Sequence, residues 1–236
     1  MKESILITGS TGFIGQNLTK LLLSLNYKVL VLIRKESKNK LFVKKTQKNN
    51  KNFHPIYFNN INTLPKKISK LKINYVINLA TKWIDKHNFK DLIDVINSNI
   101  LFNTAVLDVV PKKNLQKFIN VSTYGLFKTS KKYNPINLYA ATKKSFEDII
   151  VHYQNNHKKT YFYNLYLYDN YGVNDKRNKI IAKILKDYKA NKKTTILSNK
   201  VELNLLNVSE ICKAFRLILE KKNKQWKLFN KSKKIY

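Results

Sequence analysis

Three glycines stand between a short apolar run and a helix-length amphipathic stretch near the start of the chain. The run Ile5–Ile7 leads directly into TGSTGFIG, residues Thr8–Gly15. In a strand–turn–helix unit such glycines permit a tight turn and let the backbone approach a pyrophosphate at the helix N-terminus. The spacing of Gly9, Gly12 and Gly15 is G-x-x-G-x-x-G, which differs from the usual G-x-G-x-x-G fingerprint. The stretch predicts a dinucleotide-binding turn or a purely structural one, and its flanking elements favour the first.

The chain then alternates short β-rich runs with helix-length amphipathic stretches, which is the pattern of βαβ units around a parallel sheet. The runs are mostly apolar, as expected for strands covered by helices on both faces. Strands are predicted at Ser4–Thr8, Lys28–Ile33, Pro55–Phe58, Tyr75–Leu79, Lys117–Ser122 and Tyr161–Leu167. Helices are predicted at Ile14–Asn26, Asp91–Val110 and Asn137–His157. The expected fold class is α/β, with a doubly wound parallel sheet.

After Tyr168 the pattern changes. A probable loop precedes a helix near Asp175–Ala190, two short strands near Thr194–Leu197 and Glu202–Leu206, and a helix near Val208–Lys221. This part is too short for a second full core. It is therefore expected to cap the carboxyl edge of the sheet.

The chain is strongly basic, with 46 Lys and Arg against 14 Asp and Glu and a net charge of +32. Such a charge ordinarily indicates a nucleic-acid or anionic-surface partner. Because the lysines are spread over nearly every segment, solvated faces are the favoured interpretation, and nucleic acid is not expected as a partner. A diffuse positive field would still attract anionic small molecules such as nucleotide sugars. The densest basic stretch, Arg34–Lys51, is expected to be a mobile surface loop.

Cysteine, histidine and apolar patterns limit the remaining possibilities. Cys212 is the single cysteine, so an intrachain disulfide is impossible. No apolar run approaches the roughly 20 residues that span a bilayer, and the N-terminus lacks a signal-peptide layout. The histidines lack metal-ligand spacing. We expect a cytoplasmic protein with no metal site and no membrane partner.

The residues after the second predicted strand bear on the choice of cofactor. A carboxylate there would bind the ribose 2′-hydroxyl of NAD, whereas a cation accommodates the 2′-phosphate of NADP. The chain places Arg34 and Lys35 at this point. NADP(H) is therefore favoured over NAD(H), against the alternative that so lysine-rich a chain is basic here by chance.

A phenol and an ammonium group share one face of a predicted helix. Tyr139 and Lys143 are four residues apart in NLYAATKKSFEDI. A lysine ammonium beside the phenol, with the positive nicotinamide ring of an oxidised cofactor, favours the phenolate and lowers its pKa from about 10. Ser122 and Thr123 follow an apolar strand, at the sheet edge where open α/β sheets bind ligands. We expect Thr123 to hydrogen-bond the substrate oxygen that Tyr139 protonates or deprotonates.

The chain resembles the extended short-chain dehydrogenase/reductases, also called the NAD-dependent epimerase/dehydratase family. The resemblance spans nearly the whole chain in the family's order, and the glycine spacing matches the family's form. It rests on TGSTGFIG, INLAT at Ile77–Thr81, INVSTYG at Ile119–Gly125, YAATK at Tyr139–Lys143 and LYDNYGVND at Leu167–Asp175.

The resemblance implies a Rossmann-type fold with a Ser/Thr-Tyr-Lys catalytic set that acts on nucleotide-linked sugars. Residues 1–168 would form the NAD(P)-binding domain, and residues 169–236 a small substrate-binding cap. Tyr139 would be the acid-base residue, Lys143 would hold the nicotinamide ribose, and Thr123 would orient the substrate oxygen. The implied cofactor contacts are Gly9, Thr11, Gly12, Phe13, Ile14, Gly15, Arg34, Leu79, Ala80, Asn99 and Lys143. The implied substrate contacts are Ser122, which is also the fallback for Thr123, with Thr123, Asn170 and Arg177.

Within the family, NPINLYAATK is most like reductases of nucleotide-linked 4-keto-6-deoxy sugars. An epimerase or dehydratase with the same residues, or a non-catalytic dinucleotide-binding remnant, are the alternatives. Many members are longer than this chain, so its C-terminal substrate lobe is expected to be shortened. The family's acidic residue after the third strand has no clear match, and Asn59 or Asn60 is expected to replace it at the adenine. A homodimer through the helices predicted at Asp91–Val110 and Asn137–His157 is expected from the family.

Overall fold

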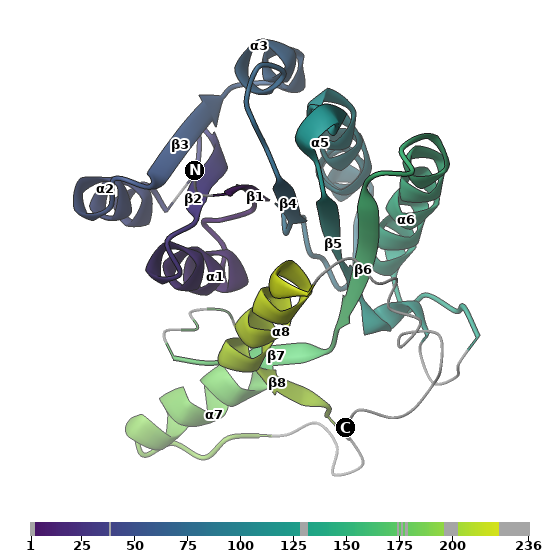
Figure 1. The fold of residues 1–236 in the computed structure, drawn as a ribbon. Coiled ribbons are helices and arrows are strands. Elements are labelled where there is room, and N and C mark those ends of the chain that lie inside the picture. Colours follow the sequence, from purple (N-terminus) through teal and green to yellow (C-terminus); the bar gives the residue numbers. More distant parts are fainter. Residues whose placement is uncertain are drawn as a thin grey trace.

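The computed structural model describes residues 3–37, 39–127, 132–173, 175, 177, 179–195 and 203–221. Its main sheet has six parallel strands in the order β3-β2-β1-β4-β5-β6 (Figure 1). The strands are β1 Ser4–Thr8, β2 Lys28–Arg34, β3 Phe53–Phe58, β4 Tyr75–Asn78, β5 Lys117–Thr123 and β6 Tyr161–Leu167. The predicted doubly wound parallel sheet is confirmed.

Helices cover both faces of the sheet. They are α1 Phe13–Ser24, α2 Lys40–Asn49, α3 Leu64–Ile68, α4 Leu92–Ile96, α5 Phe102–Val109, α6 Leu138–Asn156, α7 Ile180–Lys189 and α8 Val208–Glu220. Shorter helical turns are η1 Ile61–Thr63, η2 Phe89–Asp91, η3 Asn97–Leu101, η4 Lys112–Asn114 and η5 Tyr124–Leu126. Helices α1, α2 and α8 pack on one face, and α3, α5 and α6 on the other (Figure 1).

The two helix layers follow from the alternation of side chains along each strand. In β1, Ile5 and Ile7 join the core with α1 and α8, whereas Leu6 joins the core with α3, α5 and α6. All three side chains are fully buried. Because a strand has a side-chain period of two, a run that is apolar at every position must be covered on both faces.

A row of polar side chains crosses the sheet inside this apolar core. Thr8 Oγ1 donates to Asn78 Oδ1 over 2.7 Å, Asn78 Nδ2 to Asn120 Oδ1 over 3.2 Å, and Asn120 Nδ2 to Asn164 Oδ1 over 2.9 Å. These four residues are directly opposite one another in the strand register. A one-residue slip of any strand would break the row, so the amides help to specify how β1, β4, β5 and β6 align.

The C-terminal segment adds a second, two-stranded parallel sheet of β7 Asp169–Tyr171 and β8 Leu205–Asn207. Helix α8, which follows β8, packs on the main sheet, since its buried residues share a core with α1 and the main strands. Lys117 on β5 fixes its end by donating to the carbonyls of Ile218, Leu219 and Lys221 at 2.7–2.9 Å.

The predicted elements of this segment are found only in part. Helix α7 begins at Ile180, five residues after the predicted start, and β8 overlaps the strand predicted at Glu202–Leu206. The strand predicted at Thr194–Leu197 is not formed at residues 194 and 195, and the rest of it lies outside the described residues. Glu202 also lies outside them.

One expectation about a surface segment was wrong. The stretch Arg34–Lys51 contains α2 rather than being a loop throughout, because Val43 is buried and Phe42 packs edge-on against Phe53 at 6.4 Å between ring centroids. Within the described residues, the 21-residue helical stretch Phe89–Val109 is long and apolar enough to cross a membrane by length and composition. Two short helical turns, η2 and η3, and two helices, α4 and α5, run on without a break there, over nearly the whole helix predicted at Asp91–Val110.

Candidate active site

A cavity of about 1500 Å³ opens at the carboxyl ends of the strands. Residues after each of the six main strands line it, together with the start of α6 and part of the C-terminal segment. The strand order reverses between β1 and β4, and ligands bind in open α/β sheets at such a reversal. Pockets for one small ligand hold about 300–1,000 Å³, so this cavity has room for a dinucleotide and a second ligand.

The glycine turn forms one wall of the cavity. Gly9 has φ +68°, and a Cβ built there would lie 2.7 Å from the Ala80 nitrogen. A Cβ on Gly15 would lie 2.3 Å from the Gly9 carbonyl oxygen. Gly12 is the N-cap of α1 and gives the first turn no side-chain hydrogen bond. Close backbone approach and an uncapped helix N-terminus fit the pyrophosphate of a dinucleotide.

Most of the predicted cofactor contacts gather around this turn. The cavity lining includes Gly9, Thr11, Gly12, Phe13, Ile14, Gly15, Arg34, Leu79 and Ala80. Asn59 and Asn60, expected near the adenine, also line it. The sequence interpretation missed Glu36, which lines the cavity two residues beyond Arg34. Its signal was present in IRKES, where a carboxylate follows the two cations.

Asn99 is placed differently from the prediction. It is fully buried in η3 and is not part of the cavity lining. Its Oδ1 accepts from the Thr81 hydroxyl and the Lys82 N–H, while its Nδ2 donates to the Lys82 carbonyl and to Thr142 Oγ1, all at 2.7–3.1 Å. All four hydrogen-bonding positions of the amide are thus used within the protein. Asn99 thus holds the loop after β4 against α6 and does not line the cavity.

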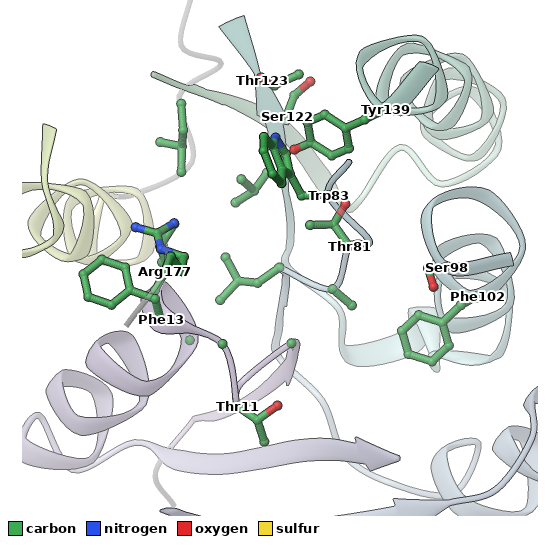
Figure 2. Close-up of a pocket in the computed structure, with 18 of the residues that line it drawn as sticks. Thr11, Phe13, Thr81, Trp83, Ser98, Phe102, Ser122, Thr123, Tyr139 and Arg177 are labelled. Carbon is green, nitrogen blue, oxygen red and sulfur yellow. The ribbon is translucent and has the colours of Figure 1, made fainter. Parts of the chain in front are cut away.

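Tyr139 and Thr123 lie together at the inner end of the cavity. Figure 2 shows the Tyr139 side chain reaching from α6 toward the end of β5, where Ser122 and Thr123 lie. Trp83, on the loop after β4, lies beside the phenol in the same view. Two segments that are distant in sequence therefore bring a phenol and hydroxyls to one place in the cavity.

The two neighbouring hydroxyls on β5 have different partners. Ser122 Oγ donates to Glu147 Oε1 at 2.5 Å, which uses its one proton. Thr123 Oγ1 accepts from the Gly125 N–H at 3.1 Å, so its own proton is left to donate elsewhere. Of the two, Thr123 is the hydroxyl suited to donate to a ligand oxygen.

Burial controls the titration of Tyr139 and Lys143. It raises the pKa of Tyr139 to about 12, with the Thr81 hydroxyl lowering that pKa in part. It lowers the pKa of Lys143 to about 8, opposed by the charge of Glu147. Lys143 is 1% exposed, lies outside the cavity lining and follows Tyr139 by one turn on α6. The sequence analysis expected this pKa to fall with an oxidised nicotinamide ring beside the phenol, and that stays a prediction for the cofactor-bound protein.

The predicted substrate contacts from the C-terminal segment also line the cavity. Arg177 donates to both carboxylate oxygens of Asp175 and to the carbonyl and amide oxygens of Asn170 at 2.7–2.8 Å. Its guanidinium lies over the Phe13 ring at 4.4 Å, as Figure 2 shows. Arg177 thus joins the C-terminal segment to the start of α1 across the cavity.

Further aromatic groups line the cavity and were not singled out from the sequence. Tyr124 and Tyr168 stack with their ring centroids 4.0 Å apart, and both are part of the lining. Lys179 Nζ lies 5.0 Å from the centroid of Trp83, which connects the loops after β7 and β4. The sequence shows that these aromatic residues are present, but which side chains they contact depends on how the loops meet in the fold.

Comparison with known proteins shows the family of the chain. The model of the "NAD dependent epimerase/dehydratase family" matches residues 5–230. The chain belongs to this family. A CDP-abequose synthase of Yersinia pseudotuberculosis is 26% identical over 94% of this chain and 75% of its own. A dTDP-D-glucose 4,6-dehydratase of Dictyostelium discoideum is 31% identical over 93% of this chain and 56% of its own.

Solved structures of the same family share the fold. UDP-glucuronic acid 4-epimerase from Bacillus cereus, in complex with NAD, has a TM-score of 0.79 and 22% identity, covering 93% of this chain and 73% of its own. dTDP-glucose 4,6-dehydratase from Bacillus anthracis, also in complex with NAD, has a TM-score of 0.77 and 22% identity, covering 94% and 73%. The Rossmann-type fold predicted from the sequence is thereby confirmed, and the chain is a member of an NAD-dependent enzyme family.

Proposed function

We propose that the protein is a cytoplasmic, NADPH-dependent reductase of a nucleotide-linked 4-keto-6-deoxy sugar. The observation that carries this proposal is the meeting of Thr123 and Tyr139 with the glycine turn in one cavity. Its similarity to CDP-abequose synthases supports the same substrate class. The positive charge of the chain, +32, favours capture of an anionic nucleotide sugar.

The proposed roles follow from the positions of the hydroxyl groups. NADPH, when bound, supplies the hydride that reduces the carbonyl carbon. The Thr123 hydroxyl donates a hydrogen bond to the carbonyl oxygen and holds that oxygen in place. Tyr139 gives that oxygen the proton it needs as charge develops on it. A phenol whose pKa burial raises to about 12 stays protonated at neutral pH, which suits a proton donor.

The remaining contacts are assigned by charge and position. Lys143, one turn after Tyr139 on α6, supplies positive charge near the phenol and is assigned to the nicotinamide ribose. Arg177 and Asn170 take the diphosphate side of the substrate, since a guanidinium pairs well with phosphate oxygens. Asn59 and Asn60 line the part of the cavity where the adenine is expected.

Arg34 carries the proposed preference for NADPH. It ends β2 and lines the cavity, which supports a role for its guanidinium in pairing with a 2′-phosphate. Glu36 lies two residues beyond and would bind the 2′-hydroxyl of NADH instead. We expect Arg34→Ala to weaken NADPH binding roughly tenfold or more, since a charged hydrogen bond is lost, and to change NADH binding less. Cofactor titration by nicotinamide fluorescence measures both.

A 4,6-dehydratase or 4-epimerase is the second candidate, because the Dictyostelium relative is a dehydratase at 31% identity. Both reactions begin by oxidising the sugar, which needs a base rather than an acid at Tyr139. The cavity lining contributed by residues 121–125 and by the start of α6 holds hydroxyls, and the carboxylates of the lining, Glu36, Asp85 and Asp169, come from other loops. These reactions also return the hydride to the sugar, so they consume no net cofactor.

The test is nicotinamide absorbance after mixing the protein with NADPH and CDP- or dTDP-linked 4-keto-6-deoxyglucose. We expect oxidation of NADPH that falls by about 10²–10⁴-fold in Tyr139→Phe. Tyr188→Phe is the matched control, since Tyr188 is exposed on α7 and is not part of the cavity lining. Flat absorbance with NADPH bound would reject the reductase for these substrates, and mass spectrometry of the sugar would then reveal epimerase or dehydratase activity.

A further inference from the structure

Glu147 is a buried carboxylate beneath the cavity whose role the catalytic set does not explain. It lies on α6 one turn after Lys143 and is 4% exposed. Its Oε1 accepts from Ser122 on β5, and its Oε2 accepts from the Tyr166 hydroxyl on β6 at 3.0 Å. The carboxylate is thus held from two strands, with each oxygen fixed by one hydroxyl.

A buried carboxylate is costly unless it is paired, and the same holds for a buried ammonium group. Residues four apart on a helix are neighbours, and Glu147 stands in that relation to Lys143. The other charged or titratable groups that bear on Glu147 are Tyr166 and Lys144, whose Nζ lies 4.0 Å from Oε2. Lys144 is itself engaged by the exposed Asp148 at 2.5 Å. Lys143 is therefore the buried cation whose charged form Glu147 stabilises.

We propose that Glu147 is a positioning residue that keeps Lys143, one turn after Tyr139 on α6, in its charged form and withholds the Ser122 hydroxyl from the ligand. The proposal rests on the proposed function in one respect, that Lys143 acts as a cation in catalysis. In Figure 2, Ser122 and Thr123 lie next to each other at the end of β5, on the side of the cavity. Because the Ser122 hydroxyl donates its hydrogen bond to Glu147, only Thr123 of the two is left to donate into the cavity.

Electrostatics gives the size of the expected effect. Charges at helical i,i+4 spacing, taken at an effective dielectric constant of about 20, change each other's pKa by about one to two pH units. Burial lowers the pKa of Lys143 to about 8, and the charge of Glu147 raises it against that trend. Without this carboxylate, Lys143 would lose its proton below neutral pH.

The first test measures Lys143 directly, in the full-length protein without substrate. Carbon-13 NMR of protein labelled at the lysine Cε follows each lysine through its titration, and the signal absent from Lys143→Met identifies the residue. We expect Glu147→Gln, which keeps the shape and removes the charge, to lower the Lys143 pKa by about one to two pH units. Asp148→Asn is the matched control, since it removes the same charge from the next residue, whose carboxylate is exposed. An unchanged Lys143 pKa in Glu147→Gln would overturn the proposal.

The second test does not depend on how well Glu147→Gln folds. Coupling between two charges is reciprocal, so removing the lysine charge must raise the pKa of the carboxylate. In Lys143→Met we expect the Glu147 pKa, followed by carbon-13 NMR at the glutamate Cδ, to rise by a similar amount. A Glu147 pKa that stays in place would reject the coupling.

Activity provides a separate readout. If the protein is a reductase, the alkaline limb of its rate against pH should move to lower pH in Glu147→Gln and stay in place in Asp148→Asn. A change in the Lys143 pKa without any reductase activity would support the coupling and reject the function. Reductase activity without a change in the Lys143 pKa in Glu147→Gln would support the function and reject the coupling.

Discussion

Adjacent hydroxyls with the same chemistry can have opposite roles when their partners differ. Ser122 donates to a buried carboxylate, whereas Thr123 accepts from a backbone N–H and keeps its proton. The sequence VST presents both at the end of one strand and gives no means to choose between them. The choice depends on Glu147, which lies 25 residues further along the chain than Ser122.

The two hydroxyls therefore predict unequal losses of activity. Thr123→Val should reduce turnover by about 10²–10³-fold, the usual cost of removing one donor to a developing oxyanion. Ser122→Ala should reduce it by less than about tenfold, because that hydroxyl does not donate to the substrate. Steady-state rates of NADPH oxidation measure both. A larger loss in Ser122→Ala than in Thr123→Val would reverse the assignment of the donor.

Lys143 also makes a prediction about stability. Its pKa is about 8 in the folded protein and 10.5 in the unfolded chain. Between these values the unfolded chain holds a proton that the folded chain has lost, so stability rises with pH. The free energy of unfolding of the wild type, relative to Lys143→Met, should increase by about 1.5 kcal/mol from pH 8 to 9.5. Urea unfolding at several pH values measures it, and a difference that is independent of pH would contradict the lowered pKa.

The sequence predicted individual site residues where strand ends determine their position. Thr123 and the glycine turn follow apolar runs, so the parallel sheet brings them to one edge. Asn99 was misplaced and Glu147 was missed, because the contacts of both residues depend on how loops and helices are arranged in the folded chain. Neither the π-helical turn that holds Asn99 nor the hydroxyls that bind Glu147 leave a periodic signal in the sequence.

At the scale of whole elements, burial decides which of them could be predicted. The six strands were predicted to within about two residues, because runs that are buried on both faces are apolar at nearly every position. Helix α2 was taken for a loop, because Val43 is its one buried residue. Four of its ten residues are lysine, so the stretch was interpreted from its charge rather than from its amphipathic pattern.

The row of amides across the sheet predicts a graded loss of stability. Asn120→Leu leaves two partners unsatisfied, Asn78 Nδ2 and Asn164 Oδ1, and should lower the free energy of unfolding by about 2–4 kcal/mol. Asn164→Leu leaves only Asn120 Nδ2 without its acceptor, and should cost about 1–2 kcal/mol. Urea unfolding of the two variants compares them directly. Equal losses would show that the row does not act through its hydrogen bonds.

At the scale of the whole molecule, one face of the structure carries unusually large exposed apolar side chains. Phe89 is 88% exposed and Ile93 73% exposed on the stretch Phe89–Val109, and Val151 is exposed on the neighbouring α6. Only 28% of the most apolar window of that stretch is buried within the molecule. Exposed apolar patches of this kind mark surfaces that another molecule covers.

The homodimer expected from the family would cover this face, with the stretch Phe89–Val109 and α6 from each subunit forming a four-helix interface. A bilayer is the less suitable partner, because the same stretch carries Asp91, Asp94 and Asp108, which are costly in hydrocarbon. Two helices that pack on each other and expose apolar side chains outward have the arrangement that a symmetric dimer requires.

The dimer predicts a change in mass from a single substitution. Ile93→Lys places two like charges near the centre of a symmetric interface, one from each subunit, and should convert the protein from dimer to monomer. Leu41→Lys is the matched control, since Leu41 is equally exposed on α2, at the far end of the sheet from this face. Sedimentation equilibrium measures both masses. A monomeric wild type would reject the dimer, and co-sedimentation of that monomer with lipid vesicles would assign the face to a membrane instead.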